Sequence, residues 1–203
     1  MSFLALGDSY SIGEGVPEPE RWPVRLAAQL RIEGIAVEDP QIVARTGWTT
    51  DELSAAMDRA SLQPPYALVT LLIGVNNQYR GRAPDEYRAQ FRALLARAIT
   101  LAGGEARRVI VVSIPDWGVT PFARGEGRDP QQVGLQMDAF NAIAQAEADA
   151  RRAWFVDITR ISRAPDARDL LAADGLHPSG AQYARWVEVI APVAREVLVE
   201  FSA

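Results

Sequence analysis

Five short apolar runs alternate with helix-period segments along the whole chain, and this alternation limits the possible folds more than any other feature. Each run has the length of a strand, and most of them are apolar at nearly every position, as is typical of strands buried on both faces. The expected strands cover residues 3–6, 37–44, 66–73, 109–114 and 153–158. The expected helices cover residues 22–33, 49–60, 84–101, 129–151 and 178–199. Buried strands that alternate with helices pair as a parallel sheet with helices on both faces.

The pattern predicts one α/β domain over residues 1–203. A chain of 203 residues can bury a substantial core without disulfides or metal. Its strand–helix units predict a flavodoxin-like three-layer α/β/α sandwich with a five-stranded parallel sheet. Neither an internal repeat nor a low-complexity segment interrupts this pattern.

The charge and the hydropathy pattern exclude several classes of function. The net charge is −5, and the 21 basic residues are arginines that occur in pairs at most, so no nucleic-acid partner is expected. No apolar run approaches the roughly 20 residues that cross a bilayer, so no membrane span is expected. The first residues lack the features of a secretory signal, which favours a cytoplasmic location, although a signal removed beforehand would leave the same sequence.

Cysteine is absent, and His177 is the only histidine. A thiolate nucleophile, a thiolate metal site and a zinc site with several imidazoles are therefore excluded. We expect neither a metal nor a cofactor. If the protein carries out base-assisted nucleophilic chemistry with an imidazole, His177 is the base and a serine hydroxyl is the nucleophile.

Glycines and polar residues follow each expected strand at its carboxyl end. In chain order these residues are Ser9, Gly47, Asn76, Asn77, Asp116, Trp117 and His177. The carboxyl ends of parallel strands share one edge of the sheet, and ligands bind beyond that edge. We therefore expect these residues to form one site.

The residue types at this edge suit acyl transfer. The Ser9 hydroxyl needs a base to take its proton as it attacks, and His177 can serve as that base. Asp174 lies three residues before His177 and can accept the other ring N–H. The backbone N–H groups of Ser9 and Gly47 and the side-chain amide of Asn76 can donate to a developing oxyanion.

Four short blocks carry a resemblance to a known family. They read GDSYS at residues 7–11, RTGW at 45–48, GVNN at 74–77 and DGLHP at 174–178. In this order they resemble the SGNH, or GDSL, family of serine esterases, over nearly the whole chain. The resemblance implies that Ser9 is the nucleophile and that Asp174 and His177 complete the triad. It also implies that Gly47 and Asn76 complete the oxyanion hole with Ser9.

The third block departs from the family pattern at one position. The family usually has Asp after the first Asn, and this chain has Asn77. The oxyanion donor is the first Asn, so the change affects a hydrogen bond or a charge near the site rather than the donor. The chain also lacks the G-x-S-x-G elbow of α/β-hydrolases, which disfavours that fold.

The segment after the first strand matches part of a dinucleotide-binding fingerprint. Gly13 and Gly15 fit two of its glycines, but Glu18 occupies the place of the third. We interpret residues 11–20 as a flexible loop beside the nucleophile. A nucleotide-binding flavodoxin-like protein remains an alternative, although no phosphate cradle is evident.

Four residues are candidates for substrate binding: Tyr79, Asp116, Trp117 and Phe122. Trp117 and Phe122 can wall an apolar acyl groove or pack their own loop down, and Tyr79 has the same two interpretations. The family resemblance implies several small-molecule substrates: acyl-thioesters, lysophospholipids, aryl or short alkyl esters, and acetylated carbohydrates. The aromatic residues favour an acyl chain of small to medium length.

We predict a serine hydrolase, of esterase or lipase type, that cleaves carboxylic ester or thioester bonds through an acyl-enzyme intermediate. One alternative is a carbohydrate O-acetylesterase of the same family. Another is a catalytically silent module that binds an acyl or glycan ligand. The sequence leaves the oligomeric state open.

Overall fold

One parallel sheet runs through the middle of the computed structural model, which describes residues 1–200. Its strands are β1 (Phe3–Gly7), β2 (Gln41–Ala44), β3 (Leu68–Leu72), β4 (Val109–Val112) and β5 (Trp154–Val156). They lie in the order β2-β1-β3-β4-β5, and every neighbouring pair is parallel. This is the strand order of flavodoxin-like sheets, so the expected five-stranded fold is confirmed.

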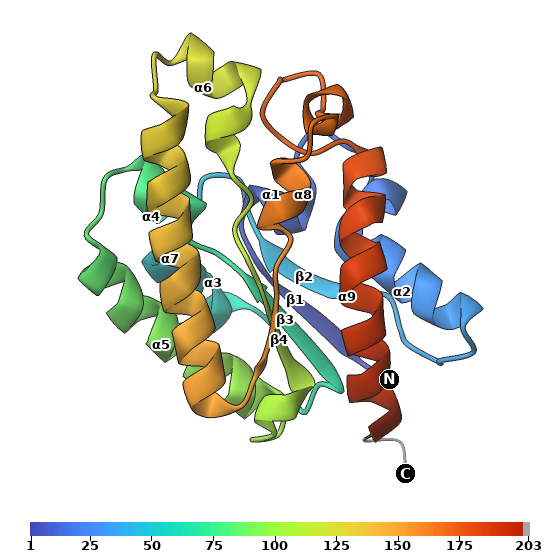
Figure 1. The fold of residues 1–203 in the computed structure, drawn as a ribbon. Coiled ribbons are helices and arrows are strands. Elements are labelled where there is room, and N and C mark those ends of the chain that lie inside the picture. The colour runs from blue at the N-terminus through green and yellow to red at the C-terminus, as the bar shows by residue number, and fades with distance from the viewer. Residues whose placement is uncertain (201–203) are drawn as a thin grey trace.

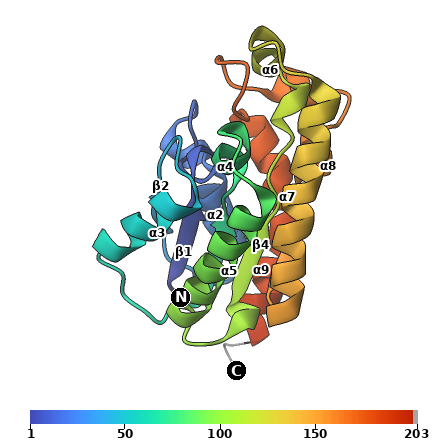
Figure 2. The same cartoon turned by 90° about the vertical axis from the view of Figure 1, so that its left-hand side faces the viewer.

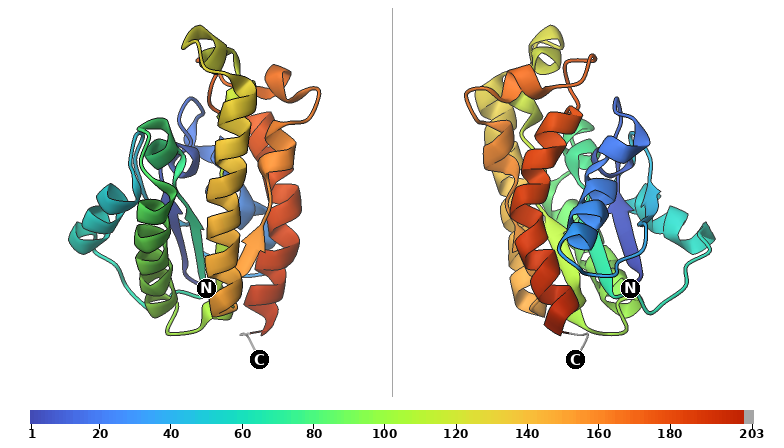
Figure 3. Two further views of the ribbon diagram at one scale, coloured as in Figure 1. Left: turned by 60° about the vertical axis from the view of Figure 1, so that its left-hand side comes forward. Right: turned by 90° about the vertical axis from the view of Figure 1, so that its right-hand side faces the viewer.

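Long helices cover both faces of the sheet. α2 (Trp22–Ile32) and α9 (Gly180–Glu200) pack together on one face. α3 (Thr50–Arg59), α5 (Pro84–Leu101) and α7 (Pro130–Arg151) cover the other face. Figure 1 shows the two groups on either side of the strands, and the two views in Figure 3 bring each group to the front.

The core forms because the strands are apolar on both faces. Every residue of β1, β3 and β4 is buried, as the continuous apolar runs predict. Between α5 and α7 the rings of Tyr87 and Phe140 stack at a centroid distance of 4.5 Å. The buried Glu147 of α7 accepts two hydrogen bonds, of 2.9 and 2.8 Å, from Arg92 of α5. These contacts tie the two helices together over the sheet.

Four strands are shorter than expected: β2, β3, β4 and β5. For β2 and β4 the reasons are identifiable. β2 begins at Gln41 rather than at residue 37, because Pro40 has no N–H to donate to the sheet. β4 ends at Val112 rather than at residue 114. Beyond it, the Ile114 N–H donates to the side-chain oxygen of Asn141 at 2.7 Å instead of to a neighbouring strand.

Short helical segments after the strands were not expected. The α-helical ones are α1 (Ser9–Ile12), α4 (Val75–Tyr79), α6 (Pro121–Gly125) and α8 (Thr159–Ser162). The 3-10 turns are η1 (Glu18–Glu20), η2 (Ala106–Arg108), η3 (Trp117–Val119) and η4 (Ala167–Leu170). The interpretation of residues 11–20 as one loop is therefore wrong at both ends. Figure 2 shows α6 at the end of the molecule opposite the chain start, and α4 nearer the middle.

None of the helices within residues 1–200 combines the length and the apolar character needed to cross a bilayer. The cellular location stays a prediction.

Gly74 connects β3 to α4 with φ at 135°, in a region that only glycine adopts easily. A Cβ there would lie 2.6 Å from a ring carbon of Tyr87 and 2.9 Å from Ile114 Cδ1. We expect Gly74→Ala to lower the free energy of unfolding by about 1–3 kcal/mol through overpacking, with backbone strain in addition. Urea denaturation measures this loss.

Gly81→Ala is the matched control, because Gly81 also has a positive φ, of 69°, but has open space around its Cβ position. Equal losses in the two variants would show that strain alone, and not the packing against Tyr87, fixes Gly74.

Candidate active site

A cavity of about 190 Å³ lies at the carboxyl ends of β1, β2 and β3. Ser9 and His177 both line it, although 168 positions separate them in the sequence. The full lining consists of Ser9, Tyr10, Thr46, Gly47, Val75, Asn76, Tyr79, Trp117, Phe122, Leu176 and His177. The parallel sheet thus brings the predicted nucleophile and the predicted base to the same cavity.

Ser9 is held at the turn between β1 and α1. Asp8 caps α1 by accepting a hydrogen bond of 3.1 Å from the Tyr10 N–H, which leaves Ser9 as the first helical residue. Gly7 packs tightly before this turn, because a Cβ there would lie 2.2 Å from Ser11 Oγ and 2.5 Å from the Leu72 carbonyl oxygen. The backbone around Ser9 is therefore fixed on both sides.

His177 and Asp174 form a tight pair on the loop before α9. His177 Nδ1 lies 2.6 Å from an oxygen of Asp174. The other carboxylate oxygen accepts the backbone N–H groups of Leu176 and His177, each at 2.9 Å. Because a carboxylate can only accept, Nδ1 carries the proton of the neutral ring and Nε2 is left as the basic nitrogen.

These hydrogen bonds keep Asp174 charged. Its partial burial raises its pKa, but the bonds from the His177 ring and from two backbone N–H groups lower it more. The pKa of Asp174 therefore lies below its ordinary value. A charged carboxylate at this place stabilises a protonated imidazole.

Ser9 and His177 both line the cavity, but within residues 1–200 no hydrogen bond joins their side chains. The Tyr10 ring packs edge-on against the His177 ring at a centroid distance of 5.7 Å and limits its rotation. Catalytic hydrogen bonds are often long in the absence of substrate and tighten when it binds.

Three residues of the cavity wall carry N–H groups that are free to donate. Within residues 1–200, the N–H groups of Ser9 and Gly47 donate to no protein acceptor. The Asn76 amide uses one N–H to bond the Trp48 carbonyl at 2.9 Å, which leaves its second N–H. All three groups belong to residues that line the cavity.

Asn77 lies behind the cavity and is fully buried. Its side-chain oxygen accepts the Thr50 N–H at 3.1 Å, and its amide donates to the Thr50 hydroxyl at 2.7 Å. That hydroxyl donates in turn to the side chain of Gln90 on α5. The departure from the usual Asp thus joins α4 to α3 through a neutral pair of hydrogen bonds.

Aromatic rings form one wall of the cavity. The rings of Tyr79 and Trp117 meet edge-on at 5.4 Å, and those of Trp117 and Phe122 lie 6.3 Å apart. The Trp117 indole N–H donates to Gln78 at 2.8 Å, so its ring position is fixed. These three predicted substrate-binding residues come together as a largely apolar surface.

Asp116 does not line this cavity, contrary to expectation. Its carboxylate accepts a hydrogen bond of 2.8 Å from Arg163 and one of 2.9 Å from the Gly118 N–H. Both bonds hold the carboxylate away from the cavity, so Asp116 shapes the loop that carries Trp117.

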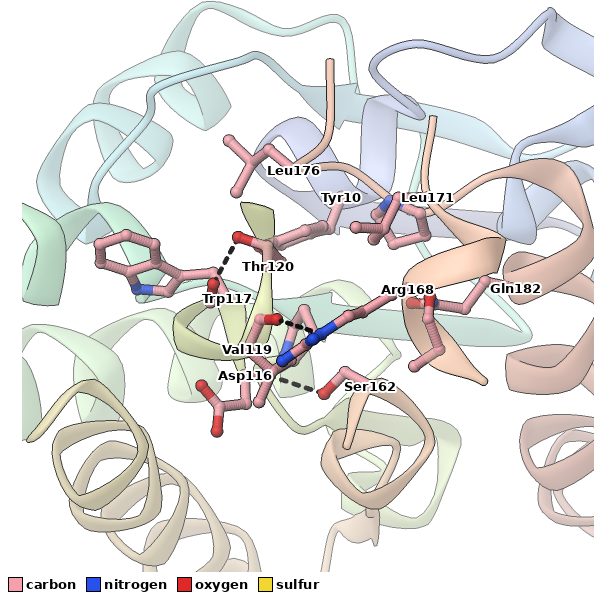
Figure 4. A pocket seen from close by; sticks show the side chains of 13 residues that line it. Tyr10, Asp116, Trp117, Val119, Thr120, Ser162, Arg168, Leu171, Leu176 and Gln182 are labelled. Atoms are coloured by element: carbon pink, nitrogen blue, oxygen red, sulfur yellow. Dashed lines mark hydrogen bonds between the residues drawn. The ribbon is translucent and has the colours of Figure 1, made fainter. Parts of the chain in front are cut away.

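A second, much smaller hollow lies beyond Trp117 (Figure 4). Its volume is about 10 Å³, roughly that needed to hold one water molecule. Tyr10, Trp117 and Leu176 line both this hollow and the main cavity. Figure 4 shows Arg168 reaching across it to the Val119 carbonyl, with a hydrogen bond of 3.2 Å. These three residues therefore form the wall between the two spaces.

Sequence reasoning missed four residues of the cavity wall: Tyr10, Thr46, Val75 and Leu176. Each lies next to a predicted residue in the chain, and that adjacency is the signal that could have found them. Residues 1–200 hold no group of three or more His, Asp or Glu side chains arranged to bind a metal ion.

Comparison with known proteins identifies the family. The model of the GDSL-like lipase/acylhydrolase family matches residues 5–185. The chain belongs to this family. The resemblance drawn from the four sequence blocks is thereby confirmed, and the protein is an esterase of the GDSL type, an enzyme that hydrolyses esters.

Individual relatives cover nearly the whole GDSL domain. Esterase TesA of Pseudomonas aeruginosa is 25% identical over 202 residues, which span 97% of this chain and 89% of that protein. A crystal structure of TesA superposes with a TM-score of 0.75 at 21% identity, covering 98% of this chain and 100% of the other. The lipase/acylhydrolase from Enterococcus faecalis gives 0.70 at 20% identity, covering 97% and 96%. These structures share the fold.

Asp8 is the most perturbed carboxyl group near the site. It is completely buried, and burial raises its pKa to about 7, although the N–H groups of Tyr10, Asp8 and Gly74 partly offset this. In the unfolded chain its pKa is near 3.8, so the folded protein holds a proton that the unfolded chain releases as the pH rises. The Asp8 carboxyl therefore lowers the free energy of unfolding progressively as the pH rises from about 3.8 to about 7.

We expect Asp8→Asn to remove this pH dependence while keeping the cap of α1, since Asn caps as well as Asp. The free energy of unfolding of the variant relative to the native protein should rise between about pH 4 and pH 7, by about 1.4 kcal/mol per pH unit at most. Urea titrations at several pH values measure it. Parallel stability curves for the two proteins would refute the assignment.

Proposed function

We propose that this GDSL esterase cleaves its substrate through a Ser9–His177–Asp174 triad and a covalent acyl-enzyme. The observation that carries the proposal is the shared cavity of Ser9 and His177, with His177 Nδ1 bound to Asp174 at 2.6 Å. That bond leaves Nε2 as the basic nitrogen on a ring that lines the same cavity as the serine hydroxyl.

The proposed reaction has two halves. His177 Nε2 takes the proton of the Ser9 hydroxyl as the oxygen attacks the acyl carbonyl, and it then gives that proton to the leaving alkoxide or thiolate. A water molecule repeats the attack on the acyl-enzyme with His177 again as base. Asp174 stays ionised in both halves, which agrees with its lowered pKa.

The oxyanion of each tetrahedral intermediate would be held by three donors. These are the N–H groups of Ser9 and Gly47, which lack protein acceptors in residues 1–200, and the second N–H of Asn76. Removing one such donor typically lowers kcat by about 10²–10³. Asn76→Ala is expected to fall in that range.

Ser9→Ala should lower kcat by at least about 10⁴, and His177→Ala should lose nearly as much, because the residues act as a unit. The double variant should be no worse than either. Stopped-flow assays with a short-chain p-nitrophenyl ester measure the rates and should show a burst with the native protein.

Ser11→Ala is the control, since the Ser11 hydroxyl is buried two residues away and has no partner within residues 1–200. Native turnover by Ser9→Ala would refute the triad, as would failure of a fluorophosphonate to label Ser9.

The cavity favours an acyl group of limited size. An engineered cavity of about 150 Å³ binds benzene, so a space of about 190 Å³ suits an acyl group on the order of six carbons. Trp117, which is 2% exposed, forms part of the wall between this cavity and the hollow beyond it. We propose short-to-medium acyl esters or thioesters as substrates.

Trp117→Ala should shift the preference toward longer acyl chains, because it joins the two spaces. A series of p-nitrophenyl esters from acetyl to palmitoyl measures kcat/KM for the native protein and the variant. The loss of a buried Trp costs about 3–5 kcal/mol, so the assay is run well below the melting temperature of the variant. Tyr79→Phe keeps the aromatic wall and should leave the chain-length profile unchanged. An unaltered profile in Trp117→Ala would show that this ring does not limit the acyl group.

A further inference from the structure

The segment that carries Gly47 is a tight turn whose conformation depends on glycine. The Trp48 N–H bonds the Arg45 carbonyl at 3.2 Å, and Gly47 has φ at 87°. A glycine at this place has wide freedom in φ and ψ. The turn alone therefore does not hold the Gly47 N–H in one direction, and an outside contact must do so.

Two donors from α4 and its C-terminal end hold the carbonyls of this turn. Asn76 donates to the Trp48 carbonyl at 2.9 Å. The Arg80 guanidinium donates to the Gly47 carbonyl at 2.6 Å. The bond from Arg80 is charge-assisted and short, which makes it the stronger of the two. It acts directly on Gly47, which lines the cavity.

Glu52 orients the guanidinium from the other side. Another nitrogen of Arg80 lies 3.3 Å from Glu52 Oε2 and 3.4 Å from its Oε1. Glu52 also accepts the Thr49 N–H at 2.9 Å in the capping box of α3. Arg80 thus bridges a fixed helix start and the Gly47 carbonyl, with its planar fork directed at both.

We infer that Arg80 is a positioning residue for the oxyanion hole: its bond to the Gly47 carbonyl holds the Gly47 N–H toward the cavity. This inference rests on the proposed function, since it assigns a role within that hole. Arg80 itself does not line the cavity, so it acts through Gly47 rather than on the substrate. Its loss should loosen one donor without removing it.

Arg80→Ala should therefore lower kcat by about 10-fold or more, but by less than the roughly 10²–10³ expected when a donor is removed outright. KM should stay within about twofold, because the loosened donor acts on the transition state. Labelling of Ser9 by a fluorophosphonate should slow in parallel. Millimolar guanidinium chloride should restore part of kcat in Arg80→Ala, which a purely structural defect would not allow.

Arg82→Ala is the matched control. Arg82 lies two residues further along and pairs with Asp51 at 2.6 Å and Glu86 at 3.3 Å, away from the Gly47 turn. It should keep kcat within about twofold of the native value. Equal losses in Arg80→Ala and Arg82→Ala would overturn the inference, as would a loss confined to KM.

Arg80→Lys tests the same point if Arg80→Ala does not fold. Lysine keeps the charge but lacks the planar fork of the guanidinium. Its kcat should therefore lie below the native value and above that of Arg80→Ala, or above that of Asn76→Ala if Arg80→Ala does not fold. A native kcat in Arg80→Lys together with no guanidinium effect would overturn the positioning role. Ser9→Ala, assayed beside these variants, separates the two proposals: if it retains activity the triad fails, and if only Arg80 variants are normal the inference alone fails.

Discussion

All strands of the sheet run in one direction, and the chemistry of this enzyme depends on that constraint. Because neighbouring strands are parallel, each connection from a strand begins at the same edge. Ser9, Gly47 and Asn76 follow three adjacent strands, and His177 reaches them from the loop before α9. Residues far apart in the chain therefore meet at this edge, and the long connection between β5 and α9 brings His177 across to β1.

The surroundings of two carboxyl groups near the cavity shift their pKa values in opposite directions. Asp8 is enclosed by the core behind Ser9, and burial raises its pKa to about 7. Asp174 is also partly buried, but its hydrogen bonds with His177 and two backbone N–H groups lower its pKa. The same side-chain type thus serves as a helix cap at one place and as a charged partner of the imidazole at the other.

The sequence predicts the sheet, the long helices and the residues of the main cavity because these leave strong local signals. Apolar runs define the strands, and the residues after them define the edge where ligands bind. Short helices such as α1 and α4 escape detection, since four or five residues carry no measurable period. Asp116 shows a different limit: its partner Arg163 lies 47 positions away, and nothing near Asp116 in the sequence marks that pairing. Arg80 escapes for the same reason, because its acceptor is a backbone carbonyl on another segment.

The neutral side chain of Asn77 determines how the hydrogen bonds beneath the cavity respond to pH. A carboxylate there could only accept, and it would compete with Gln90 for the Thr50 hydroxyl proton. The Asn77 amide accepts the Thr50 N–H through its oxygen and donates through its nitrogen to the Thr50 hydroxyl, which donates in turn to Gln90 of α5. No member of this relay titrates in the ordinary pH range. Protonation therefore leaves these hydrogen bonds beneath Asn76 unchanged, in contrast to the buried Asp8 carboxyl, whose pKa is about 7.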